Sequence, residues 1–458
     1  MGMLGTSEAA RAIHAECVGK DVTFSGVATD SRAIKTGDLF VALKGDKFDG
    51  HEFVEKALAA GAVAVMVDHR MPGDMPAIVV ADTRLGLGEL AAHWRSRFSM
   101  PVVAVTGSNG KTTVKEMIAS ILQASCEPAV ANAETQVLAT QGNLNNDIGM
   151  PLTLLGLRKQ HRYAVIEMGM NHPGEIAYLS KLAKPDVAVI NNAHAAHLEG
   201  LKTVEEVARA KGEIFEGLQQ DGVAVINADD AYAPLWQKMA AGHRVIEFGL
   251  KQAAAVTATC RLSVTGSEVL MRIPQGEVAV SLQVPGLHNV RNALAATAVA
   301  VALNIPGQAI AEGLAKFAGV KGRLQRKHGL HGAVLIDDTY NANPDSVKAA
   351  IAVLAAAPGK KILVLGDMGE LGPGAVELHA EIGAQAKQAG LDMLFALGDL
   401  SRHAVESFGT GGMYFERIQE LLADLENLLT AEATVLIKGS RFMQMERVVK
   451  SFEVRNEK

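Results

Sequence analysis

The stretch "VVAVTGSNGKTTVKEM", residues 102–117, joins an apolar run to a helical pattern through a glycine turn. It departs from the usual phosphate loop, G-x-x-x-x-G-K-[ST], because Val105 stands where the first glycine would be. The shorter loop still allows close backbone approach, and the N–H groups of a helix start favour an anion. We therefore predict that phosphate is bound by Gly107, Ser108, Asn109, Gly110, Lys111, Thr112 and Thr113.

The lysine and the threonine of this loop have separate expected roles. Lys111 would place a positive charge beside the β- and γ-phosphates of ATP, and the Thr112 hydroxyl would bind Mg²⁺. The alternative is a glycine turn that leads into a helix with a solvated lysine. The strand before the loop and the helix after it favour phosphate binding.

Strand-like and helix-like segments alternate on both sides of this loop. Continuous apolar strands separated by helices indicate parallel sheets that are covered on both faces. The expected strands of two such series lie at residues 102–105, 164–167, 187–191 and 223–226, and at 334–337, 362–365, 393–397 and 435–437. Residues 204–218 and 287–303 are each expected to form one helix, and residues 255–285 alternate as antiparallel strands do.

We therefore predict an α/β protein with three domains, because a chain of 458 residues is too long for a single core. An N-terminal α/β domain covers residues 1–98, where short apolar runs surround one helical stretch. A central parallel-sheet domain with the phosphate loop covers residues 99–318. A C-terminal Rossmann-like α/β domain covers residues 319–458.

Composition argues against several classes of protein. The formal charge of −6 gives no support to nucleic-acid binding. The longest apolar stretch, around residues 293–303, is shorter than the roughly 18 residues that a membrane helix needs, and no secretory signal pattern is present. Cys17, Cys126 and Cys260 are far apart and are expected to be free thiols in a reducing compartment. We expect a cytoplasmic monomer without membrane insertion.

Candidate metal ligands follow the next two strands. Glu167 ends the apolar run of "YAVIEMG", where an acid is costly unless it is paired, bound to a metal or, as the alternative, caps the next helix. His194 and His197 lie in "INNAHAAHLEG", but their spacing without a nearby cysteine indicates zinc only weakly. Lys211 lies in "ARAKGEIFEGL", and its pattern alone is that of a surface lysine on an amphipathic helix.

Polar residues also open two later helices. In "VPGLHNVRNALAA", Asn289 and Asn292 share a helix face and could contact a base edge, although N-capping alone explains one of them. In "IDDTYNANPDS", Asp338 ends a strand at the edge where open α/β sheets bind ligands. Capping of the following helix by Asn343 or Asp345 is the alternative use of this turn.

The motifs occur together in an order that resembles the Mur ligase family of cell-wall enzymes, over nearly the whole chain. The order is Gly-x-x-Gly-Lys-Thr-Thr, Glu-x-Gly, Ala-His-Leu-Glu, a helical Lys, His-Asn-x-x-Asn, Gly-Arg and Asp-Asp-x-Tyr-Asn-Ala-Asn-Pro. Within the family the chain looks most like the members that add D-alanyl-D-alanine. The segments that carry this resemblance are "TDSR" (29–32), "FVALKGDKFDGH" (40–51), "GNLNNDIGMPLTLL" (142–155), "DDTYNANPDS" (337–346) and "LGDMGELG" (365–372). The Asp-Asn-Pro-Arg signature of the sister ligase that adds diaminopimelate is absent.

The resemblance implies an ATP-dependent amide ligase of peptidoglycan precursor synthesis, with UDP-N-acetylmuramoyl-tripeptide and D-alanyl-D-alanine as its partners. ATP would phosphorylate the tripeptide carboxylate, and the dipeptide amine would then displace phosphate. The residues expected to act on the reacting groups are Lys111, Lys211, His197, Glu167 and Arg323. Mg²⁺ would be held by Thr112, Glu167, His197 and Lys211, the lysine as a carbamate. His197 is preferred to His194 because Ala-His-Leu-Glu stands where relatives have Asp-His-Leu-Asp.

The resemblance also assigns binding residues to each domain. Asn289 and Asn292 would lie at adenine, Arg323 at phosphate and Asp338 at ribose. The UDP group would be bound in the N-terminal domain by Thr29, Asp30, Ser31 and Arg32. The peptide substrates would meet Asn143, Asn145, Asn146, Asn341 and Asn343.

Two other functions compete with this interpretation. Folylpolyglutamate synthase shares the loop and the architecture, but the UDP-type motifs of residues 1–98 argue against it. A regulatory P-loop NTPase would need no third α/β domain carrying Asp-Asp-x-Tyr-Asn. Phosphate release that requires both the UDP-tripeptide and the dipeptide would separate the three.

Overall fold

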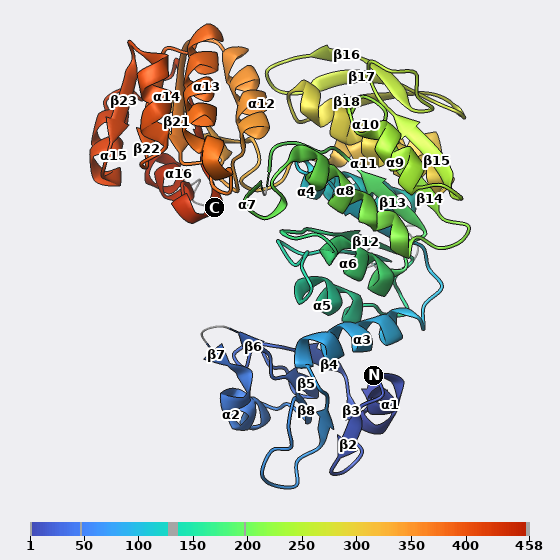
Figure 1. The fold of residues 1–458 in the computed structure, drawn as a ribbon. Helices are drawn as coiled ribbons and strands as arrows, with labels where there is room; N and C mark the ends of the chain where they lie inside the picture. The colour runs from blue at the N-terminus through green and yellow to red at the C-terminus, as the bar shows by residue number, and fades with distance from the viewer. Residues whose placement is uncertain (1, 46–47, 127–135, 197, 455–458) are drawn as a thin grey trace.

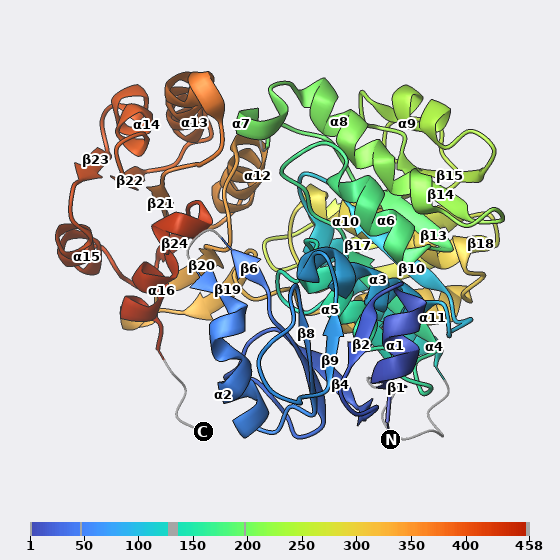
Figure 2. The same ribbon diagram turned by 60° about the horizontal axis from the view of Figure 1, so that its bottom comes forward.

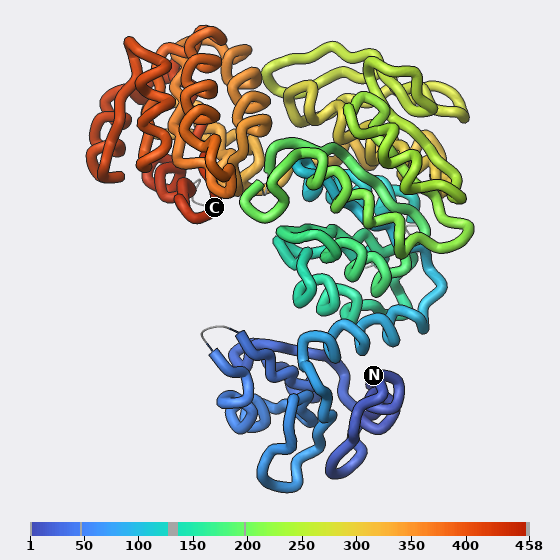
Figure 3. The backbone as a smooth tube through the Cα atoms, in the orientation of Figure 1, coloured from blue at the N-terminus to red at the C-terminus, as the bar shows by residue number. Residues whose placement is uncertain are grey.

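The computed structural model describes residues 2–45, 48–126, 136–196 and 198–454. Three sheet-containing bodies follow one another along the chain, as the ribbon in Figure 1 and the tube in Figure 3 show. The predicted α/β class with three domains is confirmed, and no helix in the described part of the chain is long and apolar enough to cross a membrane. Cys17, Cys126 and Cys260 are unpaired, as expected.

The N-terminal body is built on a five-stranded sheet in the order β2-β9-β8-β5-β4, in which only β2 runs antiparallel to its neighbour. Its strands are β2 Glu16–Val18, β4 Gly26–Ala28, β5 Asp38–Val41, β8 Ala64–Val67 and β9 Ala77–Val79. Its helices are α1 Thr6–Ala12, α2 Val54–Ala59, preceded by the 3-10 turn Gly50–Phe53, and α3 Thr83–Arg95. The short pairs are β1 Leu4–Gly5 with β3 Thr23–Phe24, and β6 Lys44–Gly45 with β7 Phe48–Asp49.

The central body contains a parallel six-stranded sheet in the order β11-β12-β10-β13-β14-β15. Its strands are β10 Val102–Thr106, β11 Val137–Ala139, β12 Tyr163–Glu167, β13 Val187–Ile190, β14 Val223–Asn227 and β15 Arg244–Phe248. Its helices are α4 Lys111–Ser125, α5 Gly149–Leu155, α6 Glu175–Ala183, α7 Leu198–Leu201, α8 Val204–Gly212, α9 Ala233–Met239, α10 Leu287–Ala302 and α11 Gly307–Lys316. An antiparallel sheet of β16 Thr257–Leu262, β17 Ser267–Ile273 and β18 Gly276–Leu282 confirms the alternation predicted there.

The C-terminal body has a six-stranded sheet in the order β19-β20-β24-β21-β22-β23, parallel except for β19. Its strands are β19 Gln325–His328, β20 Val334–Asp338, β21 Lys360–Gly366, β22 Met393–Leu397, β23 Gly412–Phe415 and β24 Ala433–Lys438. Its helices are α12 Pro344–Ala355, α13 Ala375–Gln388, α14 Ser401–Phe408, α15 Ile418–Glu426 and α16 Glu446–Phe452. The boundaries at residues 98 and 318 stay predictions.

Alternate residues of each central strand point to opposite faces of the sheet, so one strand contributes side chains to two cores. Ala104 and Ile166 belong to the core on the α5 and α6 side, whereas Val105 and Val165 belong to the core under α4 and α10. Both cores are covered, which explains why the strands are apolar at every position.

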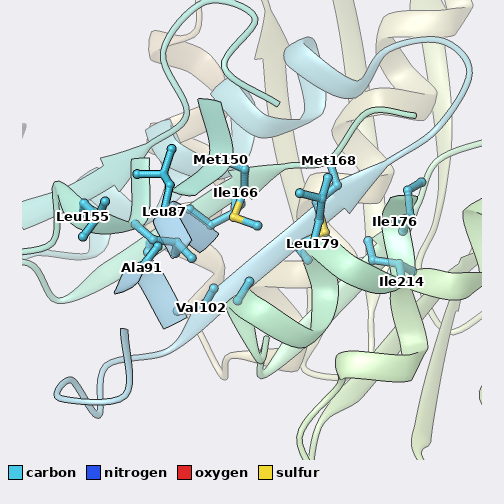
Figure 4. Close-up of a cluster of buried hydrophobic side chains, with 14 of the residues drawn as sticks. Leu87, Ala91, Val102, Met150, Leu155, Ile166, Met168, Ile176, Leu179 and Ile214 are labelled. Atoms are coloured by element: carbon cyan, nitrogen blue, oxygen red, sulfur yellow. The ribbon is translucent and has the colours of Figure 1, made fainter. Parts of the chain in front are cut away.

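Helix α3 joins the N-terminal and central bodies through one continuous core. Leu87, Leu90 and Ala91 pack with the N-terminal sheet and with Met150 and Leu154 of α5 in a single buried cluster, part of which Figure 4 shows. Full burial of a side chain of Leu size contributes about 1.5–3 kcal/mol. The two bodies are therefore held together by the same force that holds each of them.

One predicted helix needs correction. Residues 204–218 were expected to form a single helix, but α8 ends at Gly212 and a 3-10 segment covers Glu213–Gly217. Helix α8 begins with a capping box, in which the Thr203 side chain accepts a hydrogen bond from the Glu206 N–H and the Glu206 carboxylate accepts one from the Thr203 N–H. The predicted 287–303 helix is confirmed as α10.

Candidate active site

The phosphate loop connects β10 to α4 in the way its sequence predicts. Gly110 lies just before α4 with φ +77°, and a Cβ there would overlap the side-chain oxygen of Asn292. Only glycine combines that backbone angle with that close neighbour. The Lys111 Nζ donates to the Gly107 carbonyl oxygen at 2.7 Å, so the lysine folds back over its own loop.

A cleft of about 1120 Å³ surrounds the loop and extends between the central and C-terminal bodies. Most of the predicted site residues line it: Ser108, Asn109, Gly110, Lys111, Thr113, Asn143, Asn145, Asn146, Glu167, Asn289, Asn292, Arg323, Asp338, Asn341 and Asn343. Gly107 and Thr112 lie beside the cleft within the same loop, but Thr29, Asp30, Ser31 and Arg32 are not part of its wall. Residues from the carboxyl edge of the central sheet, from α10 and from the C-terminal body therefore meet at one place.

Glu167 has a free oxygen in this cleft. Its side chain is buried, with 2% exposure, and Oε1 accepts a hydrogen bond from Asn145 Nδ2 at 2.7 Å. The Oε2 atom is buried and has no hydrogen-bond partner among the described residues. Helix α6 is preceded by Gly174 rather than capped by this acid, so the capping alternative is wrong. An orphaned carboxylate oxygen beside Lys111 fits a hard cation.

Lys211 is not a surface residue. It is 2% exposed, and burial, followed by the charge of Lys111, holds its pKa well below the ordinary value. The surface-lysine alternative is therefore wrong. His197 lies outside the described residues, whereas His194 lines the cleft with Nδ1 3.4 Å from Asp345 Oδ2.

The amides at the start of α10 form a local network. Asn289 Nδ2 donates to the Pro285 carbonyl at 2.8 Å, and Asn292 Nδ2 donates to Asn289 Oδ1 at 3.3 Å. Asn191 Nδ2 in turn donates to Asn292 Oδ1 at 2.9 Å. The residue at the N-cap is Gly286, so N-capping explains neither asparagine.

Two residues of the C-terminal body contact the phosphate loop directly. The Arg323 Nη2 donates to Thr112 Oγ1 at 2.9 Å, and its guanidinium lies 4.2 Å from the Tyr340 ring centre. Asn343 Nδ2 donates to Asn109 Oδ1 at 2.8 Å. The Asn343 Oδ1 atom also accepts a hydrogen bond from the Ser346 N–H and so caps α12. Helix capping, the alternative role for this residue, is therefore confirmed, and it does not exclude a contact at the site.

Asp338 is held by groups that the sequence did not single out. Its Oδ2 accepts from Lys438 Nζ at 2.6 Å, and its Oδ1 accepts from the Leu324 N–H at 3.1 Å. Burial raises the pKa of this carboxyl, and the Lys438 charge opposes that rise. The signal for Lys438 was available, because it ends the apolar strand in "TVLIKGS" at the same sheet edge as Asp338.

Two asparagines after β13 were also missed. Asn192 Oδ1 accepts from the Asn109 N–H at 2.8 Å, and Asn191 Nδ2 donates to the Asn109 carbonyl at 2.9 Å. They fix the phosphate loop against the neighbouring strand. The polar pair "NN" directly after a buried strand was the sequence signal.

The chain matches three family models in order along its length. They are the Mur ligase family, catalytic domain, at residues 23–95, the Mur ligase middle domain at residues 105–300, and the Mur ligase, glutamate ligase domain, at residues 322–441. The UDP-N-acetylmuramoyl-tripeptide–D-alanyl-D-alanine ligase of Escherichia coli is 43% identical over 96% of this chain and 96% of its own.

Solved structures agree with these matches. The MurF structure from Acinetobacter baumannii is 37% identical, with a TM-score of 0.91 over 98% of this chain and 99% of that one. The MurF ligase from Thermotoga maritima in complex with ADP is 30% identical, with a TM-score of 0.81 over 93% and 96% of the two chains. With a relative of this identity aligned over nearly its full length, the chain belongs to the Mur ligase family.

Proposed function

We propose that this protein joins D-alanyl-D-alanine to UDP-N-acetylmuramoyl-tripeptide at the expense of ATP. The observation that carries the proposal is the cleft in which Lys111, after β10, and Glu167, at the end of the neighbouring strand β12, meet Arg323 of the C-terminal body. The E. coli relative named above is a ligase for these two substrates. A carboxylate is inert to amines at neutral pH, so the reaction needs a leaving group on the acyl carbon. Transfer of the γ-phosphoryl group supplies it.

The chemistry follows from the charges of this cleft. A tripeptide carboxylate oxygen attacks the γ-phosphorus and ADP leaves, so two anions must be brought together. Lys111 and Arg323 offset that repulsion. The dipeptide amine then attacks the acyl carbon, and the tetrahedral intermediate loses phosphate. An amide bond forms, one acyl–oxygen bond breaks and the amine proton is released.

The residues present fit Mg²⁺. The free Oε2 of Glu167 and the Thr112 hydroxyl are hard oxygen donors near the expected phosphates, and Lys211 as a carbamate would add two more oxygens. When bound, the metal neutralises phosphate charge. We propose Thr112, Glu167 and Lys211 as its ligands, with His197 carried over from the family resemblance.

Phosphate release tests the proposed function. We expect phosphate to be released from ATP only when the UDP-tripeptide and D-alanyl-D-alanine are both present, because attack by the dipeptide amine consumes the acyl phosphate. Release without either acceptor would indicate a regulatory NTPase. Release with a folate and glutamate would indicate the folylpolyglutamate-type activity instead.

We expect the C-terminal body to rotate relative to the central one when ATP and the UDP-tripeptide bind. Polar contacts hold the two bodies at the loop, through Arg323 with Thr112 and Asn343 with Asn109. Leu198 of α7 donates its N–H to the Glu370 carbonyl at 3.1 Å, and Figure 2 shows α7 beside helices α12 and α13 of the C-terminal body. Phosphates need the same polar groups, and polar interfaces between domains permit motion. The apolar core around α3 joins the N-terminal body to the central body, so we expect no comparable rotation between those two.

Small-angle scattering measures this motion. The radius of gyration should change when both ligands are saturating and stay constant with the UDP-tripeptide alone. An unchanged value with both ligands bound would count against rotation.

A further inference from the structure

One corner of the cleft contains an ion pair that the proposed chemistry does not use. Arg84 lies in the first turn of α3, and Asp147 lies in the loop before α5. The Arg84 Nη2 donates to Asp147 Oδ1 at 2.7 Å, and Nε lies 2.5 Å from Oδ2, so the pair is bidentate. Arg84 lines the cleft and its side chain is 50% exposed, while that of Asp147 is 33% exposed. A ligand in the cleft can therefore reach both charges.

The corner and Glu167 line the same cleft and are connected by one loop. Asn145 donates to Glu167 at 2.7 Å, and Asp147 follows Asn145 by two residues in the same loop. Two residues of extended chain span at most about 7 Å. Because Glu167 and Arg84 line one cleft, a substrate whose reacting carboxylate lies at Glu167 can extend a linear side chain, about 6 Å long across five bonds, towards Arg84.

The charges of the corner suit a group that carries both signs. Asp147 holds the pKa of Arg84 above its ordinary value, and Asp82 and Glu175 contribute to the same shift. Burial raises the pKa of the neighbouring Tyr178 phenol to about 12, and the negative charge of Asp147 adds to the rise. Several carboxylates thus surround one guanidinium. An ammonium is attracted by the acids, and a carboxylate has one cation to bind.

On the basis of the proposed function, we propose that Arg84 and Asp147 select the third residue of the tripeptide. That residue would be a diamino diacid such as diaminopimelate, with its distal carboxylate on Arg84 and its distal ammonium on Asp147. Lysine carries the ammonium alone and would leave Arg84 without a new partner. A ligase from A. baumannii that is 37% identical is named for a substrate containing 2,6-diaminopimelate.

The free protein keeps both charges satisfied by pairing them with each other. The zwitterion exchanges this one pair for two charge-assisted contacts, and the planar fork of arginine matches a carboxylate with two hydrogen bonds. Binding therefore leaves no charge unpaired. It also links α3, and with it the N-terminal body, to the loop that holds Glu167.

Arg84→Gln tests the assignment, with Arg97→Gln as the matched control. Arg97 follows the other end of α3 and also pairs with a carboxylate, that of Glu8, but it does not line the cleft. The measurement is kcat/KM for UDP-tripeptides ending in diaminopimelate or in lysine, with ATP and D-alanyl-D-alanine saturating. We expect Arg84→Gln to lower the ratio of diaminopimelate to lysine by about tenfold, and Arg97→Gln to leave it unchanged.

Asp147→Asn supplies the second arm, because both substrates carry the ammonium. It should lower kcat/KM for both tripeptides together. Equal losses of kcat/KM on both tripeptides in Arg84→Gln would overturn the assignment. The ion pair would then serve only to connect α3 to the loop. A raised KM for D-alanyl-D-alanine with an unchanged ratio would assign Arg84 to the dipeptide carboxylate instead. Failure of the wild-type protein to form product with either tripeptide would refute the proposed function itself.

Discussion

Lys111→Ala should abolish phosphate release while the fold persists. The Lys111 ammonium is half-buried at the start of α4, where desolvation lowers its pKa, the nearby Glu167 carboxylate opposes that shift, and Arg323 reinforces it. Its Nζ lies 2.7 Å from the Gly107 carbonyl oxygen, within the loop that would receive the γ-phosphate. Loss of one charge that acts on a developing anion costs about 10²–10³-fold in rate. We expect a loss at least this large with all substrates saturating.

A matched variant separates this effect from damage to the fold. Lys181→Ala removes an exposed lysine that pairs with Glu216 on the outer surface, and it should retain full activity. Circular dichroism should be the same for both variants and the wild type. Near-wild-type turnover by Lys111→Ala would remove the phosphate-loop assignment.

Lys211→Ala should nearly eliminate ligation, and acetate or formate should partly restore it. An ammonium beside Mg²⁺ would repel the metal, whereas a carbamate offers two anionic oxygens. Carbamylation requires the neutral amine, which is scarce for a lysine with the ordinary pKa of about 10.4. The buried position of Lys211 and the charge of Lys111 lower that pKa, so more of the reactive neutral form is present than in an ordinary lysine.

The rescue has an internal control. Restored activity should rise with carboxylate concentration in Lys211→Ala and be absent in the Lys111→Ala and Lys111→Ala/Lys211→Ala variants. A fully active Lys211→Ala protein would show that this lysine is not a ligand. Inactivity without rescue would leave the carbamate unproven, because a poor fit of the carboxylate in the vacated space has the same result.

Stability gives Lys211 a readout that does not depend on activity. Because its pKa is depressed in the folded state, the unfolded chain binds more protons between the folded pKa and about 10.4. The stability of the ligand-free wild type should therefore rise with pH through that window. Lys211→Met removes the titration, so its melting temperature should exceed that of the wild type near pH 7, with the gap narrowing towards pH 10.

Local pattern was sufficient for much of the fold. Four of the six strands in each of the two large sheets were predicted, because a strand that is buried on both faces must be apolar throughout, which a short window of sequence shows. Helix α3 was missed although its signal exists: Asp82 caps it, and Leu87, Leu90, Ala91 and Trp94 recur at helical spacing. Strands of three or four residues such as β11 and β23 carry too few positions for a pattern to emerge.

What the sequence by itself determined is the phosphate loop, since its glycines, lysine and flanking elements act within a few residues of one another. What only the tertiary structure decided is which distant groups share the cleft. The burial of Lys211, the free oxygen of Glu167 and the Arg84–Asp147 pair depend on how sheet edges meet, and 63 residues separate the members of that pair. Periodicity reports which face of an element is buried, but it contains no information on which other element buries it.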